Sequence, residues 1–207
     1  MQPTDDVPFA DVLTDVAQLT ERHAAPSSAV QAKKIDHVDA WAASLVAASS
    51  LVLVATADAS GRSTVSPRGG PPGFVRVLDP HRLALTEAPG NRLLDSSRNL
   101  LENPQVGLLF VVPGQTWTLR VEGRAWLTTD PSVRDPEHPD RLVLGVQVRS
   151  VFVHCGRAFD LGGVWQPEAW PQDVPDAAQV FLGHVAANRA AQGQSAAQGQ
   201  PAAPSRQ

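Results

Sequence analysis

The chain has 207 residues, 43% of them hydrophobic and 18% charged, and a formal net charge of −4. This length is sufficient for one domain with its own core, and the negative balance gives no broad basic field that would favour nucleic acid. A single cysteine excludes an internal disulfide, and no run approaches the roughly 18 apolar residues of a membrane-spanning helix, so we expect a cytoplasmic protein with neither nucleic acid nor membrane as a partner.

The first part of the chain, residues 1–35, is predicted to be a helical extension. Apolar residues recur there at helical spacing, at Phe9, Val12, Leu13, Val16 and Leu19. This pattern predicts a helix over 8–23, and Pro26 separates it from the next helix. That second helix is predicted from a cap at Asp36 to about Ala48, with Trp41 on its core-facing side.

Short β-rich runs come after the helices. A hairpin is predicted from Leu51–Thr56 and Arg62–Ser66, joined by a turn at 58–61. The segment 66–74 reads Ser-Pro-Arg-Gly-Gly-Pro-Pro-Gly-Phe, and its proline and glycine content predicts neither a helix nor the interior of a sheet. Further strands are predicted at 74–78, 82–86, 105–112, 117–127 and 141–155.

Two more helices are predicted, over Arg92–Glu102 and over Asp176–Ala191. Strands at hairpin distances with few crossover helices favour a mainly β fold, an antiparallel barrel with flanking N- and C-terminal helices, over a parallel sheet. We place this domain at 36–190. The Ala-, Gln- and Gly-rich residues 191–207 have no apolar bulk and are predicted to be a disordered tail.

Two features of the sequence are typical of an anion site. Arg68 lies beside glycines that allow backbone to approach a ligand closely, and Asn91-Arg92 opens a predicted helix whose N-terminus offers free N–H groups. Each feature also has a purely structural interpretation: the Arg68 segment could be a rigid connection between strands, and Asn91-Arg92 could be an ordinary helix cap followed by a solvated arginine. Together, Arg68 and Arg92 could close on one phosphate with charge-assisted hydrogen bonds. Nearby hydroxyl donors are Ser66, Thr86, Ser96 and Ser97.

The order of these motifs resembles the pyridoxamine 5′-phosphate oxidase-like, FMN-binding split-barrel family over roughly residues 36–165. The motifs that carry the resemblance are Ser66-Pro-Arg-Gly69, Leu85-Thr86, Asn91-Arg92, Glu102-Asn-Pro104 and Arg120-Val-Glu-Gly123. The signatures His154-Cys-Gly-Arg157 and Trp165-Gln-Pro-Glu-Ala-Trp170 are similar to those of a bacterial branch of that family. The resemblance implies an antiparallel split β-barrel, a bound FMN, and a homodimer with the flavin in the crevice between subunits.

The resemblance also implies which residues hold the FMN. The family's cofactor strand corresponds to Ser63, Thr64, Val65, Ser66, Pro67 and Arg68, in which Ser63 replaces the usual arginine and Arg68 the usual lysine. The aromatic-Thr pair of the next strand corresponds to Leu85 and Thr86. The phosphate-binding pair corresponds to Asn91 and Arg92, with Ser96 as a further donor, and the family's glutamine before Arg-Val-Glu-Gly corresponds to Thr118.

The expected function is that of an FMN-dependent oxidoreductase, which transfers hydride or electrons between a reduced donor such as NAD(P)H and a small acceptor. Vitamin-oxidising members of the family use a Tyr, Arg and Ser cluster, whereas this chain has no tyrosine, so true pyridoxamine-phosphate oxidase activity is not expected. No side chain is identified as catalytic. The alternatives are a flavin-binding carrier or stress-related module without turnover, and a haem- or deazaflavin-binding relative.

Four further residues have no assigned role. His154 could face a flavin, and Cys155 is expected to be a small buried hydrophobic residue. Trp165 and Trp170 either pack over a bound ring or hold the C-terminal segment on the barrel. The six histidines are scattered without paired spacing, so no metal is predicted.

Overall fold

A computed structural model of the protein describes residues 8–90 and 92–198. The chain divides into two compact units, Met1–Trp165 and Gln166–Gln207. The predicted boundaries at residues 35 and 190 stay predictions. The helices of the first unit are α1 (Val16–Thr20), α2 (Ser28–Ala32), α3 (Ala40–Ala48), α4 (Asp95–Glu102) and α5 (Arg157–Leu161).

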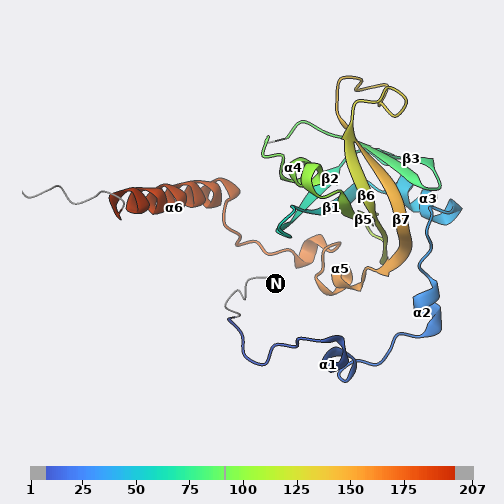
Figure 1. Cartoon of the computed structure of the whole chain (residues 1–207), viewed down its shortest axis with the longest axis horizontal. Helices are drawn as coiled ribbons and strands as arrows, with labels where there is room; N and C mark the ends of the chain where they lie inside the picture. Colours follow the sequence, from blue (N-terminus) through green and yellow to red (C-terminus); the bar gives the residue numbers. More distant parts are fainter. Residues whose placement is uncertain (1–7, 91, 199–207) are drawn as a thin grey trace, which may run out of the picture. The chain divides into compact units, whose positions relative to one another are not determined.

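The first unit is built on a seven-stranded antiparallel sheet with the order β2-β1-β5-β6-β7-β4-β3. Figure 1 shows the sheet as strongly curved, with α4 beside β1 and β2 and with α3 beside β3. The sheet does not close on itself, so β2 and β3 are its edges. The mainly β, split-barrel fold class is confirmed. The strands are β1 (Leu51–Ala57), β2 (Ser63–Gly69), β3 (Val75–Asp79), β4 (Arg82–Thr86), β5 (Gln105–Val111), β6 (Trp117–Thr128) and β7 (Val143–Cys155).

Alternation along the strands determines which side chains form the core. Val52 and Val54 of β1 are fully buried, and Leu108 and Phe110 lie opposite them on β5. Residues that face each other across an antiparallel pair project from the same side of the sheet. These positions therefore define one inner face, which the buried residues of α3 and α4 also join.

The N-terminal extension is less helical than predicted. Of the helix expected over 8–23, only α1 forms, and it begins at Asp15, whose carboxylate accepts a hydrogen bond from the N–H of Gln18 at 2.9 Å. A second short helix, α2, begins after Ser27, which caps it. Neither helix buries a residue. Both therefore lack the tertiary packing that gives most helices their stability and length.

The cap of α3 is Asp39 and not Asp36. The Asp39 carboxylate accepts from the N–H of Ala42 at 2.8 Å, whereas Asp36 is hydrogen-bonded to the His37 ring. With this start, Ala42 and Val46 stand one helical turn apart and face the sheet. Trp41 is consequently 81% exposed, which contradicts its predicted place in the core.

The segment Pro67-Arg68-Gly69 is part of β2, although its composition predicts an irregular connection. β2 pairs with β1 over its whole length, with Pro67 opposite Leu53. Proline is tolerated here because β2 is an edge strand, where the missing N–H need not bond a second neighbour. This edge position keeps Arg68 in a regular ladder that fixes the direction of its side chain.

α4 begins at Asp95, three positions after the predicted start at Arg92. Arg92 and Leu94 have left-handed backbone, with φ of 62° and 59°, and such residues cannot continue a right-handed helix. Asn91, the other residue of the predicted start, lies outside the described residues. The face that α4 packs on the sheet consists of Ser96, Asn99 and Leu100.

The second unit contains a short 3₁₀ helix, Pro167–Ala169, and α6, Ala177–Gln198. Asp176 precedes α6 and accepts a hydrogen bond from the N–H of Ala178 at 2.7 Å. α6 includes residues 191–198, where a disordered tail is predicted, and the remaining tail residues 199–207 lie outside the described part. No helix among the described residues is long and apolar enough to cross a membrane.

Candidate functional site

A cavity of about 530 Å³ lies between the end of β2 and the start of α4. It brings together residues from three segments that are distant in sequence, namely β2, the loop after β4 and the first turn of α4. Its lining consists of Ser66, Pro67, Arg68, Glu87, Ala88, Pro89, Gly90, Arg92, Leu93, Leu94, Asp95 and Ser96.

Arg68 is the main charged group of this cavity. It stands opposite Val52 in the β1–β2 register, so its side chain leaves the sheet on the inner face. Its Nη2 lies 3.3 Å from Oε2 of Glu87, and 28% of the side chain is exposed. Its Nε is buried and has no hydrogen-bond partner among the described residues. Because a buried charged donor is costly to leave unpaired, Arg68 fits an anionic ligand in this cavity.

The start of α4 adds further donors. Ser96 is 4% exposed, and its hydroxyl donates to the Ser66 hydroxyl at 3.2 Å, which joins α4 to β2. Leu94 occupies the cap position and offers no side-chain acceptor to the first turn. Within residues 8–90 and 92–198, no side chain caps the first N–H groups of α4, and a helix N-terminus in that state favours a negative charge.

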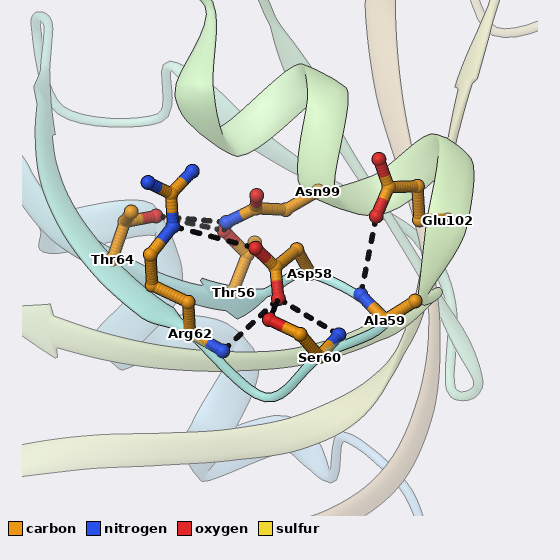
Figure 2. A network of polar contacts seen from close by, with 8 residues as sticks. All are labelled: Thr56, Asp58, Ala59, Ser60, Arg62, Thr64, Asn99 and Glu102. Carbon is orange, nitrogen blue, oxygen red and sulfur yellow. Dashed lines mark hydrogen bonds and ion pairs between the residues drawn. The ribbon is translucent and has the colours of Figure 1, made fainter.

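A polar network holds α4 against the β1–β2 hairpin (Figure 2). Asn99 is 4% exposed, and its amide donates to the hydroxyls of Thr56 and Thr64 at 3.0 and 3.1 Å. The two threonine hydroxyls also lie 3.1 Å apart. At the end of the helix, the N–H of Ala59 donates to Glu102 at 3.2 Å. These contacts fix the position of α4 relative to β2, and thereby the width of the cavity.

The turn of the hairpin is held by Asp58. Its carboxylate accepts from the hydroxyl and the N–H of Ser60 at 2.6 and 2.9 Å, and it lies 3.3 Å from the Arg62 guanidinium. The hydrogen bond from the Ser60 hydroxyl is the main cause that lowers the pKa of Asp58. A charged Asp58 is therefore favoured, and it keeps the turn before β2 closed.

Replacement of Asn99 tests whether this network matters. Asn99→Leu preserves size but leaves the two threonine hydroxyls without the amide donor, so we expect the free energy of unfolding to fall by about 1–3 kcal/mol. The measurement is urea-induced unfolding. Arg98→Ala is the matched control on the exposed side of the same helix, and a surface change of this kind is expected to stay within about 0.5 kcal/mol. Equal effects of the two substitutions would contradict the proposed role of Asn99.

The predicted cofactor residues do not all lie in one place. Ser66, Pro67, Arg68, Arg92 and Ser96 line the cavity together. Thr64 belongs to the Asn99 network, Ser63 is exposed at the start of β2, and Leu85 is buried in the core. Two more lie on the outer face of the sheet: Val65 lines a separate cavity with Arg120 and His154, and Thr118 donates a hydrogen bond to the His154 carbonyl at 3.2 Å.

A second cavity of about 370 Å³ adjoins the first at Ala88. The glycines and prolines of 69–73 form one wall, and Thr86 is the predicted cofactor residue that lines it. Its polar lining includes the cations Arg76 and Arg141, the carboxylates of Asp135 and Glu137, and the ring of His138. Arg76 also donates to the carbonyl of Val133, which ties the 129–142 loop to β3. This cavity offers both charge signs to a polar molecule beside the Arg68 cavity.

Glu87 and Asn99 are site residues that the sequence did not indicate. Asn99 lies on a helix whose sequence predicts an apolar face of leucines. Of these, Leu100 is buried as predicted, whereas Leu93, Leu94 and Leu101 are exposed. The sequence feature that could have indicated Asn99 is an inward-facing threonine on each strand of the hairpin, together with an asparagine on the helix that packs against them. Glu87 comes directly after β4 and had no distinguishing neighbour.

The structure also shows where the four residues without an assigned role lie. Cys155 is exposed, which corrects its prediction as a buried residue. His154 lines the outer-face cavity with Val65. Trp165 stacks on Phe159 with ring centroids 5.5 Å apart, and Trp170 is 53% exposed.

Comparisons with known proteins identify similar sequences and folds. A family model described as pyridoxamine 5′-phosphate oxidase matches residues 38–155. No curated protein matches the chain. Solved structures include a Lactobacillus delbrueckii protein assigned to pyridoxamine 5′-phosphate oxidase, which is 26% identical, with 58% of this chain and 98% of that chain covered and a TM-score of 0.46.

Two further structures share less sequence. A variant of HupZ from Group A Streptococcus is 18% identical, with 56% of this chain and 99% of that chain covered and a TM-score of 0.46. HutZ, the haem storage protein from Vibrio cholerae, is 16% identical, with 58% of this chain and 97% of that chain covered and a TM-score of 0.40.

Proposed function

The chain belongs to the pyridoxamine 5′-phosphate oxidase family, and from this premise we propose that it is a flavoprotein that binds FMN with the phosphate in the Arg68 cavity. The observation that carries the proposal is the convergence of Arg68, Arg92 and the start of α4 on one cavity. The Nε of Arg68, buried and without a hydrogen-bond partner in the described part of the chain, supports an anion as the occupant. Phosphate is the anion that such a set of charged and N–H donors suits.

The residues of this chain have distinct roles in the proposal. Arg68 and Arg92 supply positive charge, and Ser66 and Ser96 supply hydroxyl donors. Glu87, which lines the same cavity, pairs with the Arg68 guanidinium and so orients it. Asn99 sets the separation of β2 and α4. Bound FMN would supply hydride or electron transfer, as its own chemistry allows.

The proposed reaction is a transfer between a reduced donor such as NAD(P)H and a small acceptor. The adjoining cavity with Arg76, His138 and Arg141 is the proposed place for the reacting partner, because it opens beside Ala88.

We further propose a homodimer that completes the flavin site. Apolar side chains that line the cavity support it, since Leu93 and Leu94 are 58% and 55% exposed. Sedimentation of a monomer at micromolar concentration would contradict the dimer.

The decisive experiment is the absorbance spectrum and mass of whatever copurifies with the full-length protein. We expect one FMN per chain, bleached anaerobically by NADPH or NADH and restored by an acceptor. A flavin that neither nucleotide bleaches would reject the nicotinamide donor and favour a binding module. If the protein is colourless and takes up no added FMN, the proposed cofactor is wrong. A deazaflavin or haem spectrum would identify that group as the cofactor in place of FMN.

Arg92→Ala is expected to weaken FMN binding about tenfold, toward the lower end of the range for a charged hydrogen bond. Arg92 lines the cavity but is exposed, so solvent screens its charge more than that of Arg68. Titration of the apoprotein with FMN, followed by flavin fluorescence, measures the dissociation constant. An unchanged constant would mean that Arg92 does not contact the phosphate.

A further inference from the structure

Three cations surround one aromatic ring on the outer face of the sheet, which is opposite the face that packs against α4. Phe152 of β7 is 6% exposed. The Nζ atoms of Lys33 and Lys34 lie 5.4 and 5.0 Å from its ring centroid, and Cζ of Arg120 lies 5.7 Å from it. All three are within cation–π range. The ring is thus covered by long basic side chains, whose stems pack on it while their charges stay in water.

The backbone holds these cations in place. The N–H of Ile35 donates to the Val151 carbonyl at 3.0 Å, and the N–H of Val151 donates back at 2.7 Å. This bridge fixes the segment that carries Lys33 and Lys34 beside the part of β7 that extends beyond its pairing with β4. Arg120 stands directly opposite Phe152 in the β6–β7 register. The cluster is therefore built on three segments whose backbones are held together by hydrogen bonds.

The cluster carries an excess of positive charge. Arg120 has a carboxylate partner, Glu122, at 2.8 Å. Within the described ranges neither Lys33 nor Lys34 has a carboxylate at ion-pair distance, and the nearby Asp36 is bonded to His37 instead. Like charges around one ring repel each other, and a bound anion would offset that repulsion.

An apolar groove begins at the same lysine. It has a volume of about 440 Å³ and is lined by Ala29, Val30, Lys33, Trp117 and Val153. The three largest apolar side chains, Val30, Trp117 and Val153, are 48%, 54% and 39% exposed. Exposed apolar surface of this kind is typical of an interaction site, and the volume suits a small ligand. Lys33 belongs to both the groove and the cation cluster.

We propose that the groove and the cations bind a small amphipathic carboxylate. Its carboxylate is held by Lys33, Lys34 and Arg120, and its apolar body lies against Val30 and Trp117. The match between a cationic rim and an apolar floor favours this ligand over a neutral hydrophobe or a simple anion. None of these residues lines the Arg68 cavity, so the proposed carboxylate and the FMN phosphate occupy different cavities.

Calorimetric titration of the full-length protein with octanoate tests the proposal, with acetate and 1-octanol as the matched probes. We expect saturable binding of one octanoate per chain, with acetate and 1-octanol each weaker by roughly tenfold or more because each lacks one half of the recognition. Absence of octanoate binding would overturn the proposal. If 1-octanol binds as tightly as octanoate, the carboxylate charge is not recognised. If acetate binds as tightly as octanoate, the apolar groove is not used. Either result would overturn the proposal.

Two sets of variants connect the binding to these residues. The double variant Lys33→Gln/Lys34→Gln is expected to lose octanoate affinity by roughly tenfold or more, while Arg149→Gln, which removes a positive charge from the exposed part of β7 outside the cluster, should not. Val30→Asp puts a negative charge in the groove on an exposed helix and should also weaken octanoate. Octanoate affinity that is unchanged in both the double variant and Val30→Asp would overturn the proposal.

Discussion

Arg68→Ala is expected to weaken FMN binding by about 1.5–3 kcal/mol, which corresponds to roughly ten- to a hundredfold in the dissociation constant. The guanidinium has a buried Nε without a partner among the described residues, and its Nη2 is 3.3 Å from Glu87. Its removal deletes the main cationic donor and also leaves Glu87, which is 16% exposed, facing the phosphate without a counter-charge. Titration of apoprotein with FMN, followed by flavin fluorescence, measures the effect.

Two companion variants make this result specific. Arg62→Ala removes an arginine from the same hairpin, but this side chain is 79% exposed and pairs with Asp58 outside the cavity, so FMN affinity should not change. Glu87→Gln removes the negative charge beside the phosphate and should tighten binding. Its combination with Arg68→Ala should show non-additive effects, because the two groups interact directly. If Arg68→Ala leaves the affinity unchanged, the phosphate does not lie in this cavity.

Much of the fold was predictable because its strands alternate on a curved, half-buried sheet. β1 shows strict alternation, and both it and β4 have their predicted starts. The errors lie where tertiary context overrides local preference. Pro67 argues against a strand in general, but an edge strand accepts it. The N-terminal pattern predicted a long helix, yet without burial only the five residues of α1 form.

The candidate site was predictable as a set of charges but not as a geometry. Ser66, Arg68, Arg92 and Ser96 were predicted from their motifs, and they line one cavity. The left-handed backbone of Arg92 and Leu94 is indicated by no propensity, and it moves the helix start to Asp95. As a consequence, Arg92 approaches the cavity from a loop and does not stand at the helix N-terminus. Its expected contribution is smaller than that of Arg68 for this reason.

Gly123→Ala is expected to lower the free energy of unfolding by about 3 kcal/mol or more, at the upper end of the range for overpacking. A Cβ at Gly123 would lie 2.1 Å from the carbonyl oxygen and 3.1 Å from the carbonyl carbon of Gln147. The register of β6 and β7 shifts between Glu122 and Gly123, so the two backbones approach closely at this bulge. Neither strand can retreat, because each is paired on its other side. Urea-induced unfolding measures the loss.

Gly107→Ala is the matched control, since Gly107 stands opposite Glu122 on the adjacent strand β5. A Cβ there meets the Ala55 Cβ at 3.7 Å, an ordinary contact. Alanine should be neutral or stabilising by up to about 1 kcal/mol, because glycine loses more chain entropy on folding. This comparison gives the glycine of Arg-Val-Glu-Gly a structural role, close approach of two backbones, and not a flavin contact. Equal urea midpoints for the two variants would show that the bulge accommodates a methyl group and would remove that explanation of the motif.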